Sequence, residues 1–238
     1  MKTIEQLKDD VWRANLLLVK HGLVIFTWGN VSAIDRNTGL VAIKPSGTDY
    51  DVMQASDMVV LDLDGAIVDG KLQPSSDTPT HLELYRTFPE IGAVVHTHSV
   101  YATAWAQAKR AIPCYGTTHA DYFFGEIPCT RILTAEEIKK DYELNTGHVI
   151  VETFRNLALS AAQMSAVIVA SHGPFSWGKN ASDAVHNAVV LEELSRMAIL
   201  TEQVSPATTA IDDNLLDKHY LRKHGDGAYY GQLAVNLK

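Results

Sequence analysis

The sequence has 238 residues, of which 46% are hydrophobic and 20% charged, a balance that indicates a folded globular protein and excludes a disordered or collagen-like chain. The formal net charge is −8, and the Lys and Arg residues are scattered without a long basic run. This argues against nucleic acid as a partner, because binding to the phosphate backbone needs a concentrated positive face.

Three features predict a cytoplasmic protein that does not associate with a membrane. Residues 1–10 lack the apolar core of a signal peptide. No apolar run approaches the roughly 18 residues of a membrane span. The two cysteines, Cys114 and Cys129, stand in no metal-binding or redox spacing, as expected in a reducing compartment.

The first part of the chain predicts one helix followed by short strands. Apolar residues recur at helical spacing from Ile4 to Lys20, and Gly22 stands where a helix often ends. The β-rich runs that follow are separated by Gly, Asn and Pro, which favours an antiparallel meander, and Asp64-Gly65 predicts a tight hairpin turn. The expected strands cover residues 23–27, 31–35, 40–44, 58–63 and 66–68.

The remainder alternates strands and helices. One helix begins near Asp77 or Thr78, with Pro79 in its first turn. Thr134 and Glu137 have capping-box spacing and predict the start of another. Further helices are expected at residues 100–109, 181–203 and 213–224. We find no repeat or linker, so the whole chain, residues 1–238, is predicted to be one α/β domain.

Two apolar runs end in histidine. Residues 91–95 precede His96-Thr97-His98, and the strand pleat sends both imidazoles to one face. A second run, residues 166–171, leads into His172. Three histidines with an open fourth position are typical of a catalytic divalent metal. The alternative, that these are hydrogen-bonded structural histidines, stays open from the pattern alone.

Three loops have the small and polar residues that let a phosphate approach the backbone. Ordinary turns have the same composition, so no single loop is decisive. Asp77 is either a helix cap or a carboxylate directed at the metal, and both roles are compatible. The loop candidates are Gly29 and Asn30, then Lys44, Ser46 and Gly47, then Ser75 and Ser76 at a helix N-terminus.

Two residues are candidates for proton transfer. Asp121 follows His119 in a loop expected near the first histidine strand, although an exposed aspartate is the commoner explanation. Tyr230 lies in a Gly-rich tail and has no evident core role. As a base it needs its pKa lowered from about 10, at about 4 kcal/mol near neutral pH, whereas a proton donor needs no shift. His219 and His224 are expected at the surface.

Short motifs extend over nearly the whole chain, up to residue 232. Together they resemble the L-ribulose-5-phosphate 4-epimerases, a family of the metal-dependent class II aldolase superfamily. The motifs are Thr27-Trp28-Gly29-Asn30-Val31-Ser32, Ile43-Lys44-Pro45-Ser46-Gly47, Pro74-Ser75-Ser76-Asp77-Thr78-Pro79-Thr80-His81, Val95-His96-Thr97-His98-Ser99, Gly116-Thr117-Thr118-His119-Ala120-Asp121-Tyr122, Ser171-His172-Gly173-Pro174-Phe175 and residues 216–225.

The resemblance implies a three-layer α/β/α domain with a central mixed, mostly antiparallel sheet. It also implies a homotetramer with active sites between subunits, in which the tail, about residues 225–238, completes the site and its tyrosine comes from the neighbouring subunit. The implied roles are zinc or another divalent ion on His96, His98 and His172 with Asp77 at or near it, substrate phosphate among Gly29, Asn30, Lys44, Ser46, Gly47, Ser75 and Ser76, and proton transfer by Asp121 and Tyr230.

The implied reaction is a metal-dependent epimerisation of L-ribulose 5-phosphate to D-xylulose 5-phosphate at C4. The C3–C4 bond breaks in a retro-aldol step, the aldehyde fragment rotates, and re-addition inverts C4, in arabinose or ascorbate-type catabolism. One alternative is an aldolase that releases both fragments, although such relatives tend to carry Glu where this chain has Asp77. Another is a non-catalytic protein that binds a metal or sugar phosphate.

Overall fold

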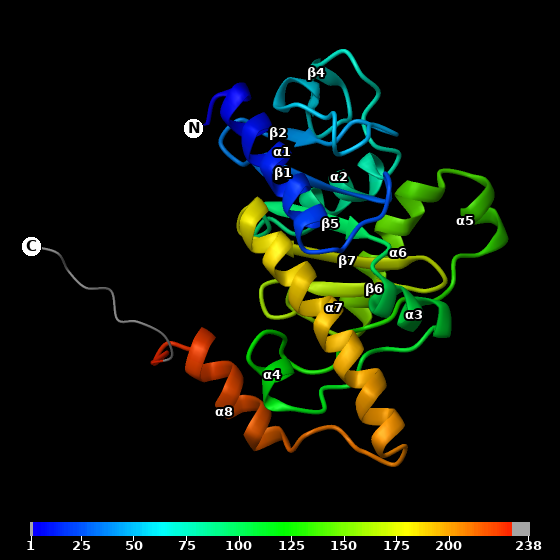
Figure 1. Ribbon diagram of the computed structural model, residues 1–238, viewed down its shortest axis with the longest axis vertical. Helices are drawn as coiled ribbons and strands as arrows, with labels where there is room; N and C mark the ends of the chain where they lie inside the picture. The colour runs from blue at the N-terminus through cyan, green and yellow to red at the C-terminus, as the bar shows by residue number, and fades with distance from the viewer. Residues whose placement is uncertain (1, 230–238) are drawn as a thin grey trace, which may run out of the picture.

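The computed structural model describes residues 2–229, so the predicted role of Tyr230 falls outside the described part. The expected α/β/α architecture is confirmed: helices cover both faces of one seven-stranded sheet of order β4-β3-β2-β1-β5-β7-β6 (Figure 1). The strands are β1 (Gly29–Asp35), β2 (Leu40–Ile43), β3 (Val59–Leu61), β4 (Ile67–Asp69), β5 (Ala93–Thr97), β6 (Ala166–Val169) and β7 (Gly173–Gly178).

The sheet was expected to be mixed and mostly antiparallel, but its ladders contain no parallel pair among the described residues. Each pair of neighbouring strands runs antiparallel, and the parallel pairing among the described residues is one isolated bridge between Cys129 and Ile168. Strand β1 pairs with β2 on one side and β5 on the other, and its register sets Asn30 opposite His96. A phosphate-loop candidate is therefore the direct neighbour of a metal-ligand candidate.

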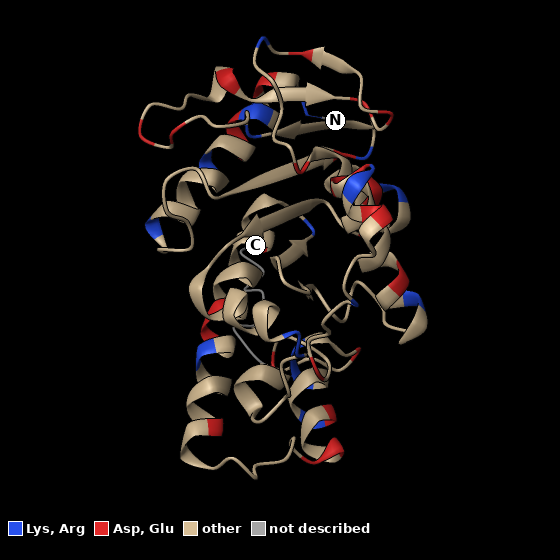
Figure 2. Cartoon of the chain, turned by 90° about the vertical axis from the view of Figure 1, so that its right-hand side faces the viewer, with Lys and Arg blue, Asp and Glu red and all other residues tan. Residues whose placement is uncertain are grey.

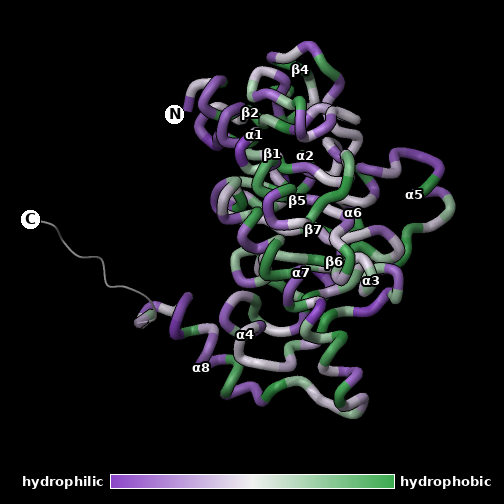
Figure 3. The backbone as a smooth tube through the Cα atoms, in the orientation of Figure 1, coloured by the Kyte–Doolittle hydropathy of each residue, from purple (hydrophilic) through white to green (hydrophobic). Residues whose placement is uncertain are grey.

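Two helices cover each face of the sheet. Helices α1 (Ile4–Lys20) and α7 (Ala181–Val204) pack on one face, with Val11 and Leu18 completely buried. Helices α2 (Thr78–Thr87) and α6 (Tyr142–Asn156) pack together on the other. Figure 3 shows hydrophobic chain in the strands of the sheet, such as β6, whereas α8 is largely hydrophilic. The apolar strand runs thus form the middle of both cores.

The remaining helices lie around this sandwich. Helix α3 (Val100–Ala108) follows β5 and packs on α7, and α5 (Ala135–Lys139) contacts α6. Helix α4 (Thr117–Ala120) lies beside α8 (Asp213–His224), beyond the β6 edge (Figure 1). A short 3₁₀ helix covers Ala55–Asp57. None of the helices described in residues 2–229 combines the length and apolar character that crossing a membrane requires.

Charged residues of both signs alternate along the helices (Figure 2). Several of them pair: the guanidinium of Arg131 contacts the carboxylates of Glu137 and Glu152, each at 2.8 Å. These groups are solvent-accessible, so the pairs contribute little stability individually.

The expected strand at residues 23–27 is wrong. The chain there is irregular, Phe26 adopts a left-handed conformation with φ 54°, and its side chain is 75% exposed. The expectation failed because the run is apolar yet has no partner strand: β1 begins only at Gly29. Strand β7 and helix α6 were not anticipated. Strand β7 begins with Gly173-Pro174, which is typical of a turn, and no side-chain cap marks the start of α6.

Candidate active site

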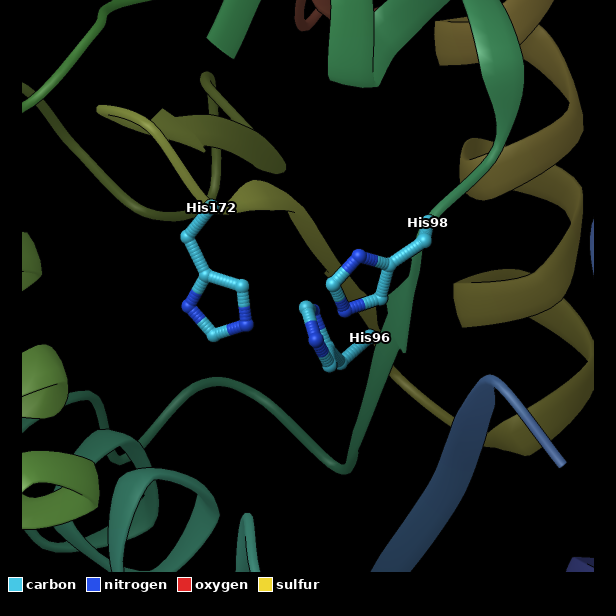
Figure 4. Close-up of side chains that lie close together, drawn as sticks. All are labelled: His96, His98 and His172. Carbon is cyan, nitrogen blue, oxygen red and sulfur yellow. The ribbon is translucent and has the colours of Figure 1, made fainter. Parts of the chain in front are cut away.

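Three imidazoles converge at one end of the sheet (Figure 4). His96 belongs to β5, His98 follows that strand, and His172 lies in the turn between β6 and β7. Their ring centroids are 4.7–5.2 Å apart, and one nitrogen of each ring lies within 4.8 Å of the others. This donor set suits a divalent ion that prefers imidazole nitrogen.

The surrounding chain fixes the orientation of two of the rings. His96 stacks on Phe175 at 4.2 Å, and its Nδ1 lies 3.0 Å from the carbonyl oxygen of Pro174. A carbonyl only accepts, so Nδ1 donates and Nε2 keeps its lone pair for a metal. His172 follows Ser171, whose φ of 62° stores strain in the turn. The Nδ1 of His172 lies 3.3 Å from the hydroxyl of Tyr142.

The surroundings of His98 and His172 disfavour their protonated forms. Burial lowers the pKa of His172 to about 3, and the charges of His96 and His98 add to the effect. His98 is solvent-accessible, but partial desolvation by the surrounding chain, followed by the charge of His96, also lowers its pKa. Because metal binding requires deprotonated imidazoles, this environment favours a metal ion over protons.

A cavity of about 900 Å³ opens in front of the imidazoles and brings together every predicted metal and phosphate residue. The three loops that were ambiguous one by one border the same space, which favours their binding role over ordinary turns. The predicted residues that line it are Gly29, Asn30, Lys44, Ser46, Gly47, Ser75, Ser76, Asp77, His96, His98 and His172.

Lys44 differs from the simple expectation of a cation that points at the ligand. Its ammonium donates to the carbonyl oxygens of Thr48, at 2.7 Å, and Pro45, at 3.3 Å, and lies 4.8 Å from the ring centroid of Tyr50. Burial lowers its pKa to about 8, against the charge of Asp49. Lys44 therefore shapes the loop at residues 45–48 while its charge stays at the cavity wall.

Asp77 stands at the N-cap position of α2 but makes no side-chain capping bond. Its Oδ2 instead accepts a hydrogen bond of 2.7 Å from the Nδ2 of Asn30. Burial alone would raise the pKa of Asp77, but the charges of His96 and His81 and the bond from Asn30 hold it below its usual value. Asp77 borders the cavity, although its oxygens are not in the tight group that the three imidazole nitrogens form.

Asp121 lies away from the imidazole cluster and does not border this cavity. It ends α4, and the guanidinium of Arg222 on α8 binds it through two bonds of 2.7 and 3.0 Å. His219 approaches at 3.1 Å, so it is not a simple surface residue, and the imidazole of His224 reaches the Asp121 carbonyl at 2.9 Å. Burial would raise the pKa of Asp121, but Arg222 and His219 hold it low.

Other residues on the cavity wall were missing from the sequence expectations. Tyr142 and Glu143 begin α6, and Thr103 and Gln107 face the cavity from α3. The hydroxyl of Thr103 is buried and has no hydrogen-bond partner among the described residues. The four-residue spacing of Thr103 and Gln107 could have suggested a shared helix face, whereas nothing local distinguishes Tyr142-Glu143.

Comparison with known proteins identifies the relatives of this chain. The family described as Class II Aldolase and Adducin N-terminal domain matches residues 9–199. The L-ribulose-5-phosphate 4-epimerase UlaF of Salmonella paratyphi B is 58% identical over 229 residues, which cover 96% of this chain and all of that protein. The protein of the same name from Salmonella typhi is also 58% identical over 229 residues.

Solved structures agree on the fold. An L-fuculose 1-phosphate aldolase superposes with a TM-score of 0.76 at 26% identity, covering 90% of this chain and 93% of that one. YgbL from Escherichia coli, a putative aldolase/epimerase/decarboxylase, gives a TM-score of 0.72 at 21% identity, covering 91% and 99%. The expected resemblance to the epimerases is confirmed, and this chain belongs to the class II aldolase family.

Proposed function

We propose that this chain is an L-ribulose-5-phosphate 4-epimerase, which interconverts L-ribulose 5-phosphate and D-xylulose 5-phosphate by retro-aldol cleavage and re-addition. The observation that carries the proposal is that three convergent imidazoles and three phosphate-type loops border one cavity. The extent of the match to UlaF, over its whole length, supports the same substrate.

The proposed metal is zinc or another divalent ion, held by His96, His98 and His172 with Asp77 at or near it. The donor chemistry fits, because one nitrogen of each ring converges on the same space and the bond to the carbonyl of Pro174 leaves the Nε2 lone pair of His96 available. When bound, such an ion supplies Lewis-acid stabilisation of the negative charge that develops as the C3–C4 bond breaks, worth several kcal/mol.

The loops around Gly29, Lys44 and Ser75 would hold the substrate phosphate and keep the aldehyde fragment from leaving before re-addition. Backbone amides and hydroxyls supply the donors, and the N-terminus of α2 adds a favourable dipole. Retention of this fragment separates an epimerase from an aldolase. Asp77, rather than Glu, at the carboxylate position favours the epimerase.

Inversion at C4 needs proton-transfer groups on two faces of the aldehyde, for which we propose Asp121 and Tyr230. Asp121 does not border the cavity of its own chain, which favours its action on the site of a neighbouring copy. We therefore propose a homotetramer with sites between subunits, each chain forming one domain whose tail, residues 225–238, completes a neighbour's site. The two free thiols, Cys114 and Cys129, suit the proposed cytoplasmic location.

The direct test is turnover of L-ribulose 5-phosphate by the purified protein, before chelation, after chelation and after zinc is returned. D-xylulose 5-phosphate and free glycolaldehyde phosphate are both assayed. We expect zinc-dependent formation of D-xylulose 5-phosphate with no released aldehyde. Released aldehyde would identify an aldolase, and the absence of either product would reject the substrate.

A substitution tests the proton-transfer role. We expect Asp121→Asn to lower kcat by about 100-fold or more, the usual range for loss of an acid–base group, with zinc content unchanged. We expect Tyr230→Phe to lower kcat by a similar factor, also with zinc content unchanged. Asp64→Asn, in an exposed turn, is the control and should turn over normally. Wild-type turnover in either site variant would remove that residue from the mechanism.

A further inference from the structure

A buried ladder of polar side chains connects the cavity with the interior of the sandwich. Asp77, His81 and Tyr85 follow one another at four-residue intervals along one face of α2, which amounts to about 6 Å per step. Asn30 and Ser32 stand two residues apart on β1 and share the face toward α2, about 7 Å from each other. The two repeats are similar enough for Asp77 to meet Asn30 and for both His81 and Tyr85 to meet Ser32.

The contacts of the ladder are short. Asn30 donates to Asp77 at 2.7 Å. The hydroxyl of Ser32 lies 2.7 Å from the Nδ1 of His81 and 2.7 Å from the hydroxyl of Tyr85. Ser32, His81 and Tyr85 are fully buried. Polar groups removed from water in this way must be satisfied by one another.

The direction of the hydrogen bonds follows from the available acceptors. Among the described residues, the hydroxyl of Ser32 is the acceptor within reach of the Tyr85 hydroxyl, so Tyr85 donates to Ser32. The single proton of Ser32 is then directed at Nδ1 of His81. The Nε2 of His81 must therefore carry the ring hydrogen, and the chain ends in a buried donor at this atom.

A buried acceptor stands on the same ladder. Nδ2 of Asn30 contacts the carboxylate of Asp77, which only accepts, so the amide orientation is fixed and its Oδ1 is an acceptor. Neither this Oδ1 nor the Nε2 of His81 has a hydrogen-bond partner among the described residues. One ordered water can serve such a buried donor and acceptor together. Burial lowers the pKa of His81 to about 3, against the charge of Asp77.

We propose that His81 is a positioning residue of the active site. Its Nε2–H, oriented by Tyr85 and Ser32, holds the amide of Asn30 through an ordered water, and Asn30 in turn holds the carboxylate of Asp77 toward the imidazole cluster. The inference rests on the proposed function, because it assigns to this chain of contacts the orientation of a group at the proposed metal.

Two replacements separate this role from simple packing. In His81→Asn the amide occupies the position of Nδ1, so the contact with Ser32 survives and the donor toward Asn30 is lost. In His81→Gln the amide reaches the position of Nε2, so the donor survives and the contact with Ser32 is lost. Leu84→Ala, on the same helix but in the apolar core, is the control for destabilisation alone.

The measurements are zinc affinity, by competition with a chromophoric chelator, the visible spectrum of the Co²⁺-loaded protein, and urea unfolding. We expect His81→Asn to weaken zinc binding by about 10–100-fold, as loss of an outer support of a metal ligand does, and to alter the cobalt spectrum. His81→Gln and Leu84→Ala should lose stability and retain wild-type affinity and spectrum.

Zinc affinity that follows stability across the three variants would overturn the inference, because it would reduce His81 to a packing residue. Should the His81 variants not fold, Tyr85→Phe removes the first donor of the chain and must still weaken zinc binding. The titration needs no substrate. A wild-type protein that binds zinc without epimerase activity would thus reject the proposed reaction alone, and one that binds no metal would reject both proposals.

Discussion

At the scale of single residues, the site depends on histidines whose charge state and orientation are set by their surroundings. His96 is buried, directed by the carbonyl of Pro174 and stacked on Phe175. His172 is kept neutral by burial. The sequence indicated all three histidines, because strand alternation and strand ends are local features. It gave no sign of the residues that orient them, which come from β7 and α6, two elements that the pattern did not reveal.

His98 offers a clean test of the metal cluster, because it is exposed and its removal disturbs no core packing. We predict that His98→Ala no longer retains stoichiometric zinc, since a ligand of the proposed site is gone. Metal content after exhaustive dialysis is the measurement. His148→Ala, a histidine with a half-exposed side chain on α6, is the control, and equal zinc in both variants would exclude His98 as a ligand.

Gly29 illustrates a backbone constraint next to the site. Its φ is +123°, and a Cβ would lie 2.8 Å from the carbonyl oxygen of His96. We predict that Gly29→Ala destabilises the fold by about 2–4 kcal/mol, through backbone strain and overpacking, and weakens phosphate binding. Gly39→Ala has a positive φ but open space around it, and should cost only about 1 kcal/mol. Urea unfolding measures the loss of stability in both variants. Equal losses would contradict the close approach of Gly29 to the carbonyl of His96.

At the scale of elements, β1 joins the two functional halves of the cavity. Its first residues belong to one of the three loops proposed to bind phosphate, and its register with β5 sets that loop beside the histidine strand. The sequence predicted the helices α1, α2, α7 and α8 well, because their periodicity or caps are local. It misplaced the start of β1, because a strand begins where a partner strand pairs with it and not where an apolar run begins.

Helix α8 is attached to α4 through Asp121, and its position depends on this contact. The bidentate pair with Arg222 is mostly shielded from water. We predict that Arg222→Ala lowers the free energy of unfolding by about 1.5–3 kcal/mol, as loss of a charge-assisted bond does, and speeds hydrogen exchange in α8. Arg196→Ala removes an exposed pair with Glu193 and should cost less than about 1 kcal/mol. Unchanged exchange in α8 would mean that other contacts hold the helix.

At the scale of the whole molecule, buried histidines couple stability to pH. Burial lowers the pKa of His119 to about 4 and that of His81 to about 3, against about 6.5 in an unfolded chain. Below pH 6.5 the unfolded state therefore takes up protons that the folded state excludes. Their contribution to stability is fully present above pH 6.5 and is lost as the pH falls toward the folded pKa values.

We predict that the metal-free protein loses about 2 kcal/mol per such histidine between pH 6.5 and pH 5. Urea unfolding at several pH values measures the slope. His119→Gln can keep the bond that Nε2 makes with the carbonyl of Gly125 while it removes one titrating group. The variant should therefore take up one proton fewer on unfolding, and its unfolding free energy should depend less steeply on pH. An identical slope would show that His119 titrates normally in the folded protein.

The sequence by itself determined the residue chemistry of this protein: the three histidines at strand ends, the loops suited to phosphate and most helix boundaries. Each of these depends on residues within one or two turns of chain. The tertiary structure alone decided that the turn carrying His172 meets β5, that three separate loops border one cavity, and that Asp121 binds α8 instead of that cavity. Such relations depend on strand order and burial between distant segments, which no local spacing contains.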